Sequence, residues 1–290
     1  MANVKLLIDS RFNDKTILEV LTYYHLGKEK IKKVKFILND IIVDKNTILK
    51  TGDILVLEYH DDIDFLPENK KLDILYEDEN LLIVNKPIGM LVHPDSKDKL
   101  GTLVNVVSNH YHKSNQNISV KYLHRIDMDT SGIVVFAKDI LTASILGEEI
   151  KKHTFTRRYL CIASGRFDSD NGIYNYPIAE NRYIANKKRV SPTGKEAITH
   201  YKVIKRLKKN LNLCEVELKT GRTHQIRVHF SYTGHPLVGD GLYNGNTNIL
   251  DRQALHSYEV DFVHPIKNKR IHIKCELPQD MQKIIDKYKN

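Results

Sequence analysis

The pattern of apolar and polar positions separates a short N-terminal region from the rest of the chain. In residues 1–59 it predicts a strand at 6–8 and a helix over 16–26, where apolar residues recur at helical spacing. A Lys-rich helix over 28–35 comes next. A hairpin follows over 36–43, with Asn39-Asp40 as its turn, and the last strand covers 54–59. We expect a small module of helices and short strands here.

The remaining chain has the pattern of apolar segments that is typical of an α+β domain. Residues 60–72 are polar and acidic with one proline, which is typical of a linker. From residue 73 to 290, apolar runs of strand length alternate with a few helical segments. The predicted strands cover 80–85, 132–137, 155–163, 197–204, 211–218, 254–263 and 270–275, and the predicted helices cover 143–151 and 278–288. Many strands mixed with few helices favour an α+β fold.

Composition narrows the class of protein. Of the 290 residues 41% are hydrophobic, so a disordered chain is excluded. No apolar run approaches the roughly 20 residues of a membrane helix, and the N-terminal sequence does not resemble a signal peptide. Three scattered cysteines, Cys161, Cys214 and Cys275, indicate neither a disulfide framework nor a zinc site. We therefore expect a cytoplasmic protein with reduced cysteines and no membrane partner.

The excess of 45 Lys+Arg over 36 Asp+Glu gives a net charge of +9, which suits an anionic partner. Part of it is concentrated in one octamer that contains Lys28, Lys30, Lys32, Lys33 and Lys35. By itself the octamer fits either a solvated helix face or a phosphate-contacting helix. The order of elements over 12–59 resembles the S4 RNA-binding module, with Leu38-Asn39-Asp40 and Thr51-Gly52-Asp53 in the places of its two turns. That resemblance favours contact with RNA.

The most informative segment for chemistry is residues 122–138, YLHRIDMDTSGIVVFAK. A polar loop with His124, Arg125, Asp127 and Asp129 ends at Gly132 and leads into an apolar strand. Catalytic side chains often lie in such loops, and a carboxylate beside an arginine stays ionised. An aspartate of this kind can act as nucleophile or general base. A turn held by Asp and Thr side chains explains the same residues equally well.

Longer sequence motifs favour the catalytic interpretation over the structural turn. HRIDMDTSG resembles the HRLDxxTSG signature of the RluA-type pseudouridine synthases. Four further segments resemble that family in the same order: NKPIGMLVHP at 85–94, RRYLCIASG at 157–165, KRVSPTGKEAITHY at 188–201, and TGRTHQIRVH with GHP and GD at 220–240. QALH at 253–256, with Phe262 and His264-Pro265, resembles the closing strand. The resemblance covers nearly all of residues 73–290.

The resemblance implies an enzyme that isomerises uridines in structured RNA without metal or cofactor, on a central mixed, largely antiparallel sheet. Carried onto this sequence, the essential residue is Asp127, with Asp129 at a variable position. Arg222 is expected to be the ionic partner that keeps Asp127 ionised, and Tyr159 to stack on the target base. A phosphate contact for Arg222 and a packing role for Tyr159 remain as alternatives.

RNA contact is expected from side chains around the signature and from the basic octamer. Arg125 would fill the gap left by the extruded base or hold a phosphate, which helps offset the cost of base flipping. The expected RNA-binding set is Arg125, His124, Lys28, Lys30, Lys32, Lys33, Lys35, Lys188, Arg189, His224 and Arg227. His93, His224 and His229 lack a zinc spacing and are interpreted as RNA-contacting or structural. Ile226, His229, Phe230 and Thr233 recur at helical spacing, which predicts a helix that packs on the sheet.

The expected substrate is large-subunit ribosomal RNA, with transfer RNA as the alternative, and no obligate protein partner is indicated. Two other classes of function stay open at this point. One is a non-catalytic RNA-binding protein on the same scaffold, in which the essential aspartate should have been lost. The other is a glycosidase that uses Asp127 and Asp129, which would require two opposed carboxylates several ångströms apart. The route of the isomerisation, the target nucleotide and the oligomeric state do not follow from the sequence.

Overall fold

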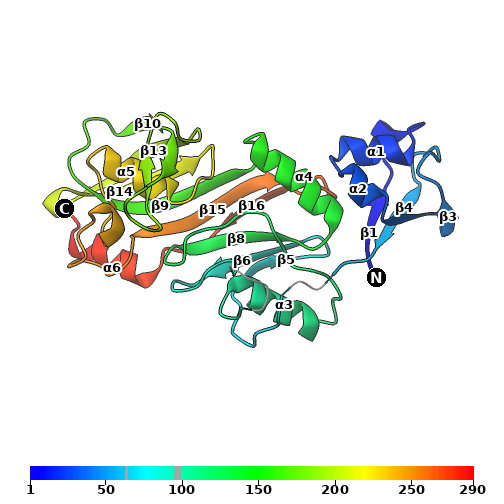
Figure 1. Cartoon of the computed structure of the whole chain (residues 1–290), viewed down its shortest axis with the longest axis horizontal. Coiled ribbons are helices and arrows are strands. Elements are labelled where there is room, and N and C mark those ends of the chain that lie inside the picture. The colour runs from blue at the N-terminus through cyan, green and yellow to red at the C-terminus, as the bar shows by residue number, and fades with distance from the viewer. Residues whose placement is uncertain (63–64, 95–98) are drawn as a thin grey trace.

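The computed structural model describes residues 1–62, 65–94 and 99–290. At one end of the molecule lies a four-stranded antiparallel sheet with strand order β1-β4-β2-β3 (Figure 1). Two helices pack on this sheet. The elements are β1 (Ala2–Leu7), α1 (Ile17–Tyr23), α2 (Lys28–Ile31), β2 (Val34–Leu38), β3 (Ile41–Val43) and β4 (Ile54–Tyr59), with a 3₁₀ turn, η1 (Ser10–Phe12). Strands, helices and hairpin were predicted in this order.

Local sequence signals account for these elements. Thr16 caps α1 in a capping box, because its hydroxyl accepts from the Glu19 amide at 3.2 Å and Glu19 accepts from the Thr16 amide at 2.8 Å. Asn39 and Asp40 both have positive φ, 47° and 67°, as the two-residue hairpin turn requires. The basic helix is shorter than predicted. It stops at Ile31 because Val34 already pairs with Tyr59 of β4.

A second, larger sheet forms the body of the molecule, and ten strands of the described chain belong to it. Its central order is β10-β13-β14-β9-β15-β8-β6-β5, with β16 beside β15 and β7 beside β8. Only β8 and β15 pair in parallel among these neighbours. The strands are β5 (Ile74–Glu77), β6 (Leu81–Lys86), β7 (Lys121–Tyr122), β8 (Ser131–Ala137), β9 (Thr156–Ser164), β10 (Asn171–Asn175), β13 (Ile198–Leu207), β14 (Leu211–Leu218), β15 (Leu255–Val263) and β16 (Arg270–Lys274). The prediction of a mixed, largely antiparallel sheet is confirmed.

Helices cover both faces of this sheet. Strand β6 shows the division, since Leu82 and Val84 belong to the apolar cluster that includes residues of α3 and α5, while Leu81 and Ile83 belong to the cluster that includes residues of α4. Alternate residues of a strand point to opposite faces, so a strand buried on both sides reads as a continuous apolar run. The helices are α3 (Leu103–Lys113), α4 (Ile140–Lys151), α5 (Gln225–Tyr232) and α6 (Gln279–Lys287). A two-stranded ribbon, β11 (Ile178–Glu180) with β12 (Lys188–Val190), and the 3₁₀ turns η2 (Lys208–Asn210) and η3 (Gly241–Tyr243) complete the fold.

Helix α3 was not predicted because polar residues interrupt its buried face. Asn105 is fully buried and donates to the Leu66 carbonyl at 2.8 Å, and Ser108 donates to the Phe65 carbonyl at 2.8 Å. Both acceptors belong to the predicted linker 60–72. Of that segment, residues 60–62 and 65–72 form no helix or strand, and residues 63–64 lie outside the described residues.

The two sheets meet at the start of α4, as Figure 1 shows. Ile140 and Leu141 are buried in the apolar cluster of the N-terminal sheet. The Tyr59 hydroxyl accepts from the Ile140 amide at 3.2 Å, and Ser144 donates to the His25 carbonyl at 2.6 Å. The N-terminal sheet is therefore docked on the larger one through buried contacts.

Gly132 sets the approach of β8 to β15 immediately after the polar loop of the signature. Its φ is 108°, and a Cβ atom there would lie 2.1 Å from the Ser257 carbonyl oxygen. Only glycine fits this position. Among the described residues, no helix is long and apolar enough to cross a membrane. The three cysteines are buried and unpaired.

Candidate active site

The signature aspartate lies on a short loop that precedes β8, residues 127–130, here called the aspartate loop. The Thr130 amide closes the loop by donating to the Asp127 carbonyl at 3.1 Å. Two buried cations hold its remaining carbonyls. Lys86 donates to Met128 at 2.9 Å, and Arg252, itself paired with Asp280, donates to Asp129 at 3.3 Å. The backbone around Asp127 is thus fixed by side chains from distant parts of the chain.

Lys86 connects the aspartate loop to the turn after β6. The side chain is fully buried, and its ammonium also donates to the carbonyls of Pro87 and Met90, both at 2.7 Å. Burial lowers the pKa of Lys86 to about 7, although the nearby Asp129 and Asp127 oppose this shift. Lys86 has three carbonyl partners and, among the described residues, no direct carboxylate partner, so it serves as a positioning residue for Asp127.

This environment makes stability depend on pH through Lys86. Between about pH 7 and its ordinary pKa of 10.5, the unfolded chain holds a proton that the folded protein has lost, so stability rises with pH in this window. We expect wild type to gain up to about 1.4 kcal/mol per pH unit relative to Lys86→Met. Urea unfolding of both proteins at pH 7, 8 and 9 measures the difference. A difference that stays constant with pH would show that Lys86 is charged throughout.

The ionic partner of Asp127 is Arg227, and the predicted pairing with Arg222 is wrong. The Arg227 Nη1 lies 3.1 Å from Asp127 Oδ2, while its Nε and Nη2 bind both oxygens of Asp240 at 2.7 and 2.9 Å. Burial alone would lower the pKa of Arg227, but Asp240 and Asp127 together raise it above its ordinary value. Because Arg227 is buried between two carboxylates, it is also not the surface RNA-binding residue that we expected.

Arg222 lies on the exposed turn between β14 and α5. Its Nε donates to the Glu196 carbonyl at 2.9 Å, and its amide donates to Gln225 Oε1 at 2.9 Å. The side chain nevertheless lines the space in front of Asp127. This placement fits contact with a substrate, the alternative that the sequence had left open for Arg222.

Tyr159 faces Asp127 from β9. The side chain is buried, and burial raises its pKa above the ordinary value. Together with Asp127 it lines a small cavity of about 50 Å³, whose apolar wall is formed by Leu218, Ile226 and Leu255. This cavity continues into a larger one of about 510 Å³, and both are lined by Asp127, Tyr159 and Arg222. An aromatic ring, an apolar wall and one carboxylate suit a planar base with a reactive centre at its edge.

Three predicted RNA contacts surround this space. Arg125 is exposed, lines both cavities and interacts with His93 through Nη1 at 3.0 Å; His93 in turn stacks on Tyr122. His224 lies 4.0 Å from Asp127 Oδ2 and bonds the Tyr243 hydroxyl at 3.0 Å. His124 is buried, and its Nε2 accepts from the Val135 amide at 3.3 Å. Arg125 is the one of these three with an exposed side chain.

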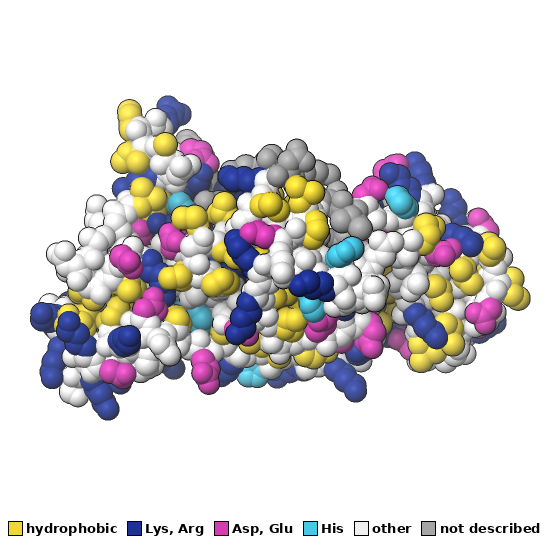
Figure 2. All heavy atoms as spheres, turned by 90° about the horizontal axis from the view of Figure 1, so that it is seen from below, with side chains coloured by type: hydrophobic (Ala, Val, Ile, Leu, Met, Phe, Trp, Pro, Cys, Tyr) yellow, Lys and Arg dark blue, Asp and Glu magenta, His cyan; other side chains and the backbone are white. Residues whose placement is uncertain are grey.

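The basic residues predicted to contact RNA are distributed over separate surfaces. The lysines of α2, the following turn and the start of β2 are all exposed, with Lys32 paired to Glu29 at 2.7 Å and Lys35 to Glu58 at 3.0 Å. Arg189 is exposed on β12, whereas the Lys188 ammonium pairs with Glu180. Figure 2 shows further Lys and Arg side chains at the opposite end, near α6, where Lys208, Lys209, Lys283, Lys287 and Lys289 are exposed.

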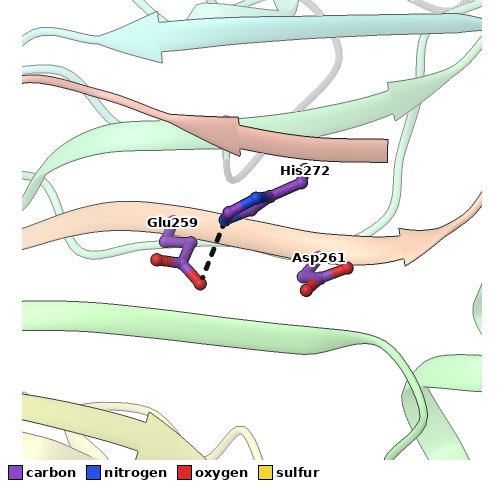
Figure 3. Close-up of side chains that lie close together, drawn as sticks. All are labelled: Glu259, Asp261 and His272. Atoms are coloured by element: carbon purple, nitrogen blue, oxygen red, sulfur yellow. Dashed lines mark ion pairs between the residues drawn. The ribbon is translucent and has the colours of Figure 1, made fainter. Parts of the chain in front are cut away.

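A cluster of Glu259, Asp261 and His272 on β15 and β16 has ligand atoms close enough to hold a metal ion (Figure 3). Its carboxylates are already neutralised. Glu259 pairs with Arg158 and with Lys274 at 3.2 Å, and Asp261 pairs with Arg270 at 2.5 Å. The arrangement is a cross-strand ion-pair network, and the lining of the cavities at Asp127 does not include it.

Sequence reasoning missed the supporting roles of Lys86, Asp240 and Arg252. Lys86 and Asp240 were quoted within matched motifs, so a signal was present, but nothing in the motifs shows what a side chain contacts. The sequence did hold an indication that Arg227 is buried. It lies within a helix whose inward face was predicted from Ile226, His229 and Phe230. A charged residue between buried positions of such a helix needs a buried partner.

The chain is similar in sequence and in fold to known proteins. The family described as RNA pseudouridylate synthase matches residues 80–232. The RNA pseudouridine synthase YhcT of Bacillus subtilis is 43% identical over 246 residues, which cover 84% of this chain and 82% of that protein. Ribosomal large subunit pseudouridine synthase D of Buchnera aphidicola (subsp. Schizaphis graminum) is 40% identical over 76% of this chain and 74% of its own length. In fold, this chain is similar to human RNA pseudouridylate synthase domain containing 4, with a TM-score of 0.60, 23% identity, and coverage of 74% of this chain and 92% of that one.

Proposed function

Because this chain belongs to the RNA pseudouridine synthase family, we propose that it isomerises specific uridines of large-subunit ribosomal RNA with Asp127 as the essential carboxylate. Family membership makes it an isomerase that acts on RNA. The choice of ribosomal RNA rests on the relatives named ribosomal large subunit pseudouridine synthase D, which are 34–40% identical to this chain. Transfer RNA is the alternative substrate that a direct assay would reveal.

The observation that carries the proposal is the convergence of three side chains on one cavity. Asp127, Tyr159 and Arg227 come from a loop, a strand and a helix that are distant in sequence, and all three line the same space. Arg227 occupies Oδ2 of Asp127, and Oδ1 accepts no hydrogen bond from any described residue. One carboxylate oxygen is thus anchored while the other faces the cavity.

This arrangement supplies what the isomerisation needs. The C1′–N1 bond of uridine breaks, the base rotates, a C1′–C5 bond forms, and the proton that leaves C5 is balanced by one gained at N1. Asp127 provides the carboxylate for the bond exchange, and the buried Arg227 holds one of its oxygens through an ionic hydrogen bond. In this proposal the ring of Tyr159 stacks on the extruded base, and its hydroxyl takes part in the proton transfer from C5.

The two other classes of function fit the site less well. A non-catalytic RNA-binding protein would not need a carboxylate held by a buried arginine in an apolar-walled cavity. A glycosidase would need a second carboxylate across the cavity from the first. Asp129, the candidate for that role, is absent from the described lining of both cavities, whereas Asp127 lines both.

Mapping pseudouridines in total RNA from cells with and without this protein tests the proposal. We expect one or a few sites in large-subunit ribosomal RNA to lose pseudouridine when the gene is deleted and to regain it on re-expression. Sites confined to transfer RNA would redirect the proposal to the alternative substrate. Unchanged RNA together with no activity of the purified protein on unmodified RNA would contradict it.

We further propose that residues 1–59 form an S4-like module that contacts RNA through α2. Lys28, Lys30 and Lys33 are exposed and form no ion pair within the described chain. Deleting the module would also uncover Ile140 and Leu141 of α4, so point substitutions give a cleaner test.

Replacing Lys28, Lys30 and Lys33 together by Ser should weaken RNA binding and lower the salt dependence of affinity. Each lost phosphate contact reduces the slope of log K against log salt by about 0.7 to 0.9, so a decrease of about 2 is expected. Filter binding to unmodified ribosomal RNA over a range of KCl concentrations measures this slope. The matched control is Lys283, Lys287 and Lys289 replaced by Ser, which removes the same charge at the other end of the molecule. Equal slopes for wild type and the α2 variant would show that α2 does not contact RNA.

A further inference from the structure

Arg157 is a buried cation without a partner. It is only 5% exposed, and none of its guanidinium nitrogens forms a hydrogen bond or ion pair with any described residue. Its Nε is completely enclosed and unpaired. A buried charge normally has an ionic or hydrogen-bonding partner, because removal from water is otherwise costly. Neither the ion pairs of the active site nor the proposed bond exchange at Asp127 uses Arg157.

The position of Arg157 on β9 directs it toward the active site. Arg157 and Tyr159 are two residues apart, so both point to the same side of the strand, and both line the cavity of about 510 Å³ beside Asp127. Arg158, on the opposite side, pairs with Glu217 at 3.1 Å and with Glu259. Neighbouring arginines on one strand thus have different environments: one is satisfied by carboxylates, and the other faces a cavity.

A second unpartnered donor lines the same cavity. His124 accepts at Nε2 from the Val135 amide, so the neutral ring carries its proton on Nδ1, which is buried and has no partner. Burial and the neighbouring Arg157 lower the pKa of His124 to about 3, so the ring is neutral at physiological pH. Two residues in the wall of one cavity thus carry N–H donors that no described protein group accepts.

The cavity as a whole favours an anion. Its lining includes five Lys and Arg side chains and only two carboxylates, Asp127 and Glu196. Asp127 is already paired with Arg227. The Arg157 guanidinium also lies against Gly221, where a Cβ atom would be 3.4 Å from Nη1, so the small residue leaves the terminal nitrogens unobstructed on that side.

We propose that Arg157 binds a backbone phosphate of the substrate RNA adjacent to the target uridine through the terminal nitrogens of its guanidinium. This inference rests on the proposed function, since it places the phosphate in the cavity next to the one that takes the base. A guanidinium matches phosphate oxygens with two parallel hydrogen bonds. Binding here would hold the strand while the base is extruded toward Tyr159 and Asp127.

The test uses the full-length protein with Arg157→Gln, Arg157→Lys and, as the matched control, Arg158→Gln. The probe is unmodified total RNA from cells that lack the gene, and filter binding, single-turnover pseudouridine formation and thermal melting are measured. Arg157→Gln should weaken RNA binding about tenfold and lower the salt slope by about 1. Its rate at saturating RNA should stay within a few fold of wild type. Arg157→Lys should keep the wild-type salt slope, and Arg158→Gln should keep both slope and affinity.

Thermal melting separates this role from a structural one. Because Arg157 has no protein partner to lose, Arg157→Gln should keep or raise the melting temperature, whereas removal of a structural arginine would lower it. Unchanged affinity and salt slope in Arg157→Gln would overturn the phosphate site. So would a fall in melting temperature by several degrees, or a loss of rate at saturating RNA without a loss of affinity. If the wild-type protein formed no pseudouridine, the proposed function would be wrong. The RNA affinity and salt slope of the variants would still test the phosphate site.

Discussion

Asp127→Asn should abolish pseudouridine formation while leaving RNA binding intact. The amide keeps the size of the side chain and can still accept a hydrogen bond from Arg227, but it cannot act as the carboxylate in the bond exchange. Loss of such a group typically reduces the rate by at least about 10⁴-fold. Single-turnover assays on unmodified RNA measure the rate, and filter binding measures the affinity.

The matched control is Asp129→Asn, on the same loop. The contact that the structure shows for Asp129 is made by its backbone carbonyl, to Arg252, and the substitution preserves it. We expect activity within a few fold of wild type. If Asp127→Asn converted uridine at the normal rate, or if Asp129→Asn were the inactive variant, the assignment of the essential carboxylate would be wrong.

Arg227→Gln should cost both activity and stability. The substitution leaves Asp240, which is only 1% exposed, without its two ionic hydrogen bonds, and a buried carboxylate in that state destabilises the fold by about 3–5 kcal/mol. It also removes the ionic partner of Asp127. Urea unfolding reports the first effect and single-turnover kinetics the second.

A double variant separates these two effects. Adding Asp240→Asn to Arg227→Gln removes the uncompensated charge, so stability should recover in part while activity stays low, because Asp127 still lacks its partner. Arg222→Gln is the control for the corrected assignment, and its exposed site should change stability by no more than about 0.5 kcal/mol. An inactive, fully stable Arg222→Gln variant beside an active Arg227→Gln variant would restore Arg222 as the partner.

Predictions from local pattern succeeded where the pattern reflects burial. The strands at 132–137 and 211–218 and the helix after His224 were found because each buries apolar residues at a regular spacing. Helix α3 was missed because Asn105 and Ser108 are buried through hydrogen bonds to a segment nearly 40 residues earlier. In a sequence, a buried polar residue cannot be distinguished from an exposed one, so the helical pattern of buried positions is lost.

In the candidate site, too, the sequence identified the residues but not their contacts. Asp127, Tyr159 and Arg222 were named from motifs, and all three line the predicted site. The predicted pairing of Asp127 with Arg222 was wrong. Arg222 and Arg227 are only five residues apart in one motif, so the motif does not show which of them reaches Asp127. The turn that precedes α5 exposes Arg222, while the helix directs Arg227 inward to Asp127 and Asp240.

By itself, the sequence determined the α+β fold class, the order of most elements, the excess of basic charge and the segments that carry the chemistry. Those properties depend on residue type and short-range spacing. Only the tertiary structure decided the pairing of Asp127 with Arg227, the enclosure of Lys86 under the aspartate loop, and the unpartnered state of Arg157 beside the cavity. These depend on which side chains meet across distant segments, because a buried charge is stable or reactive according to the partners that the fold brings to it.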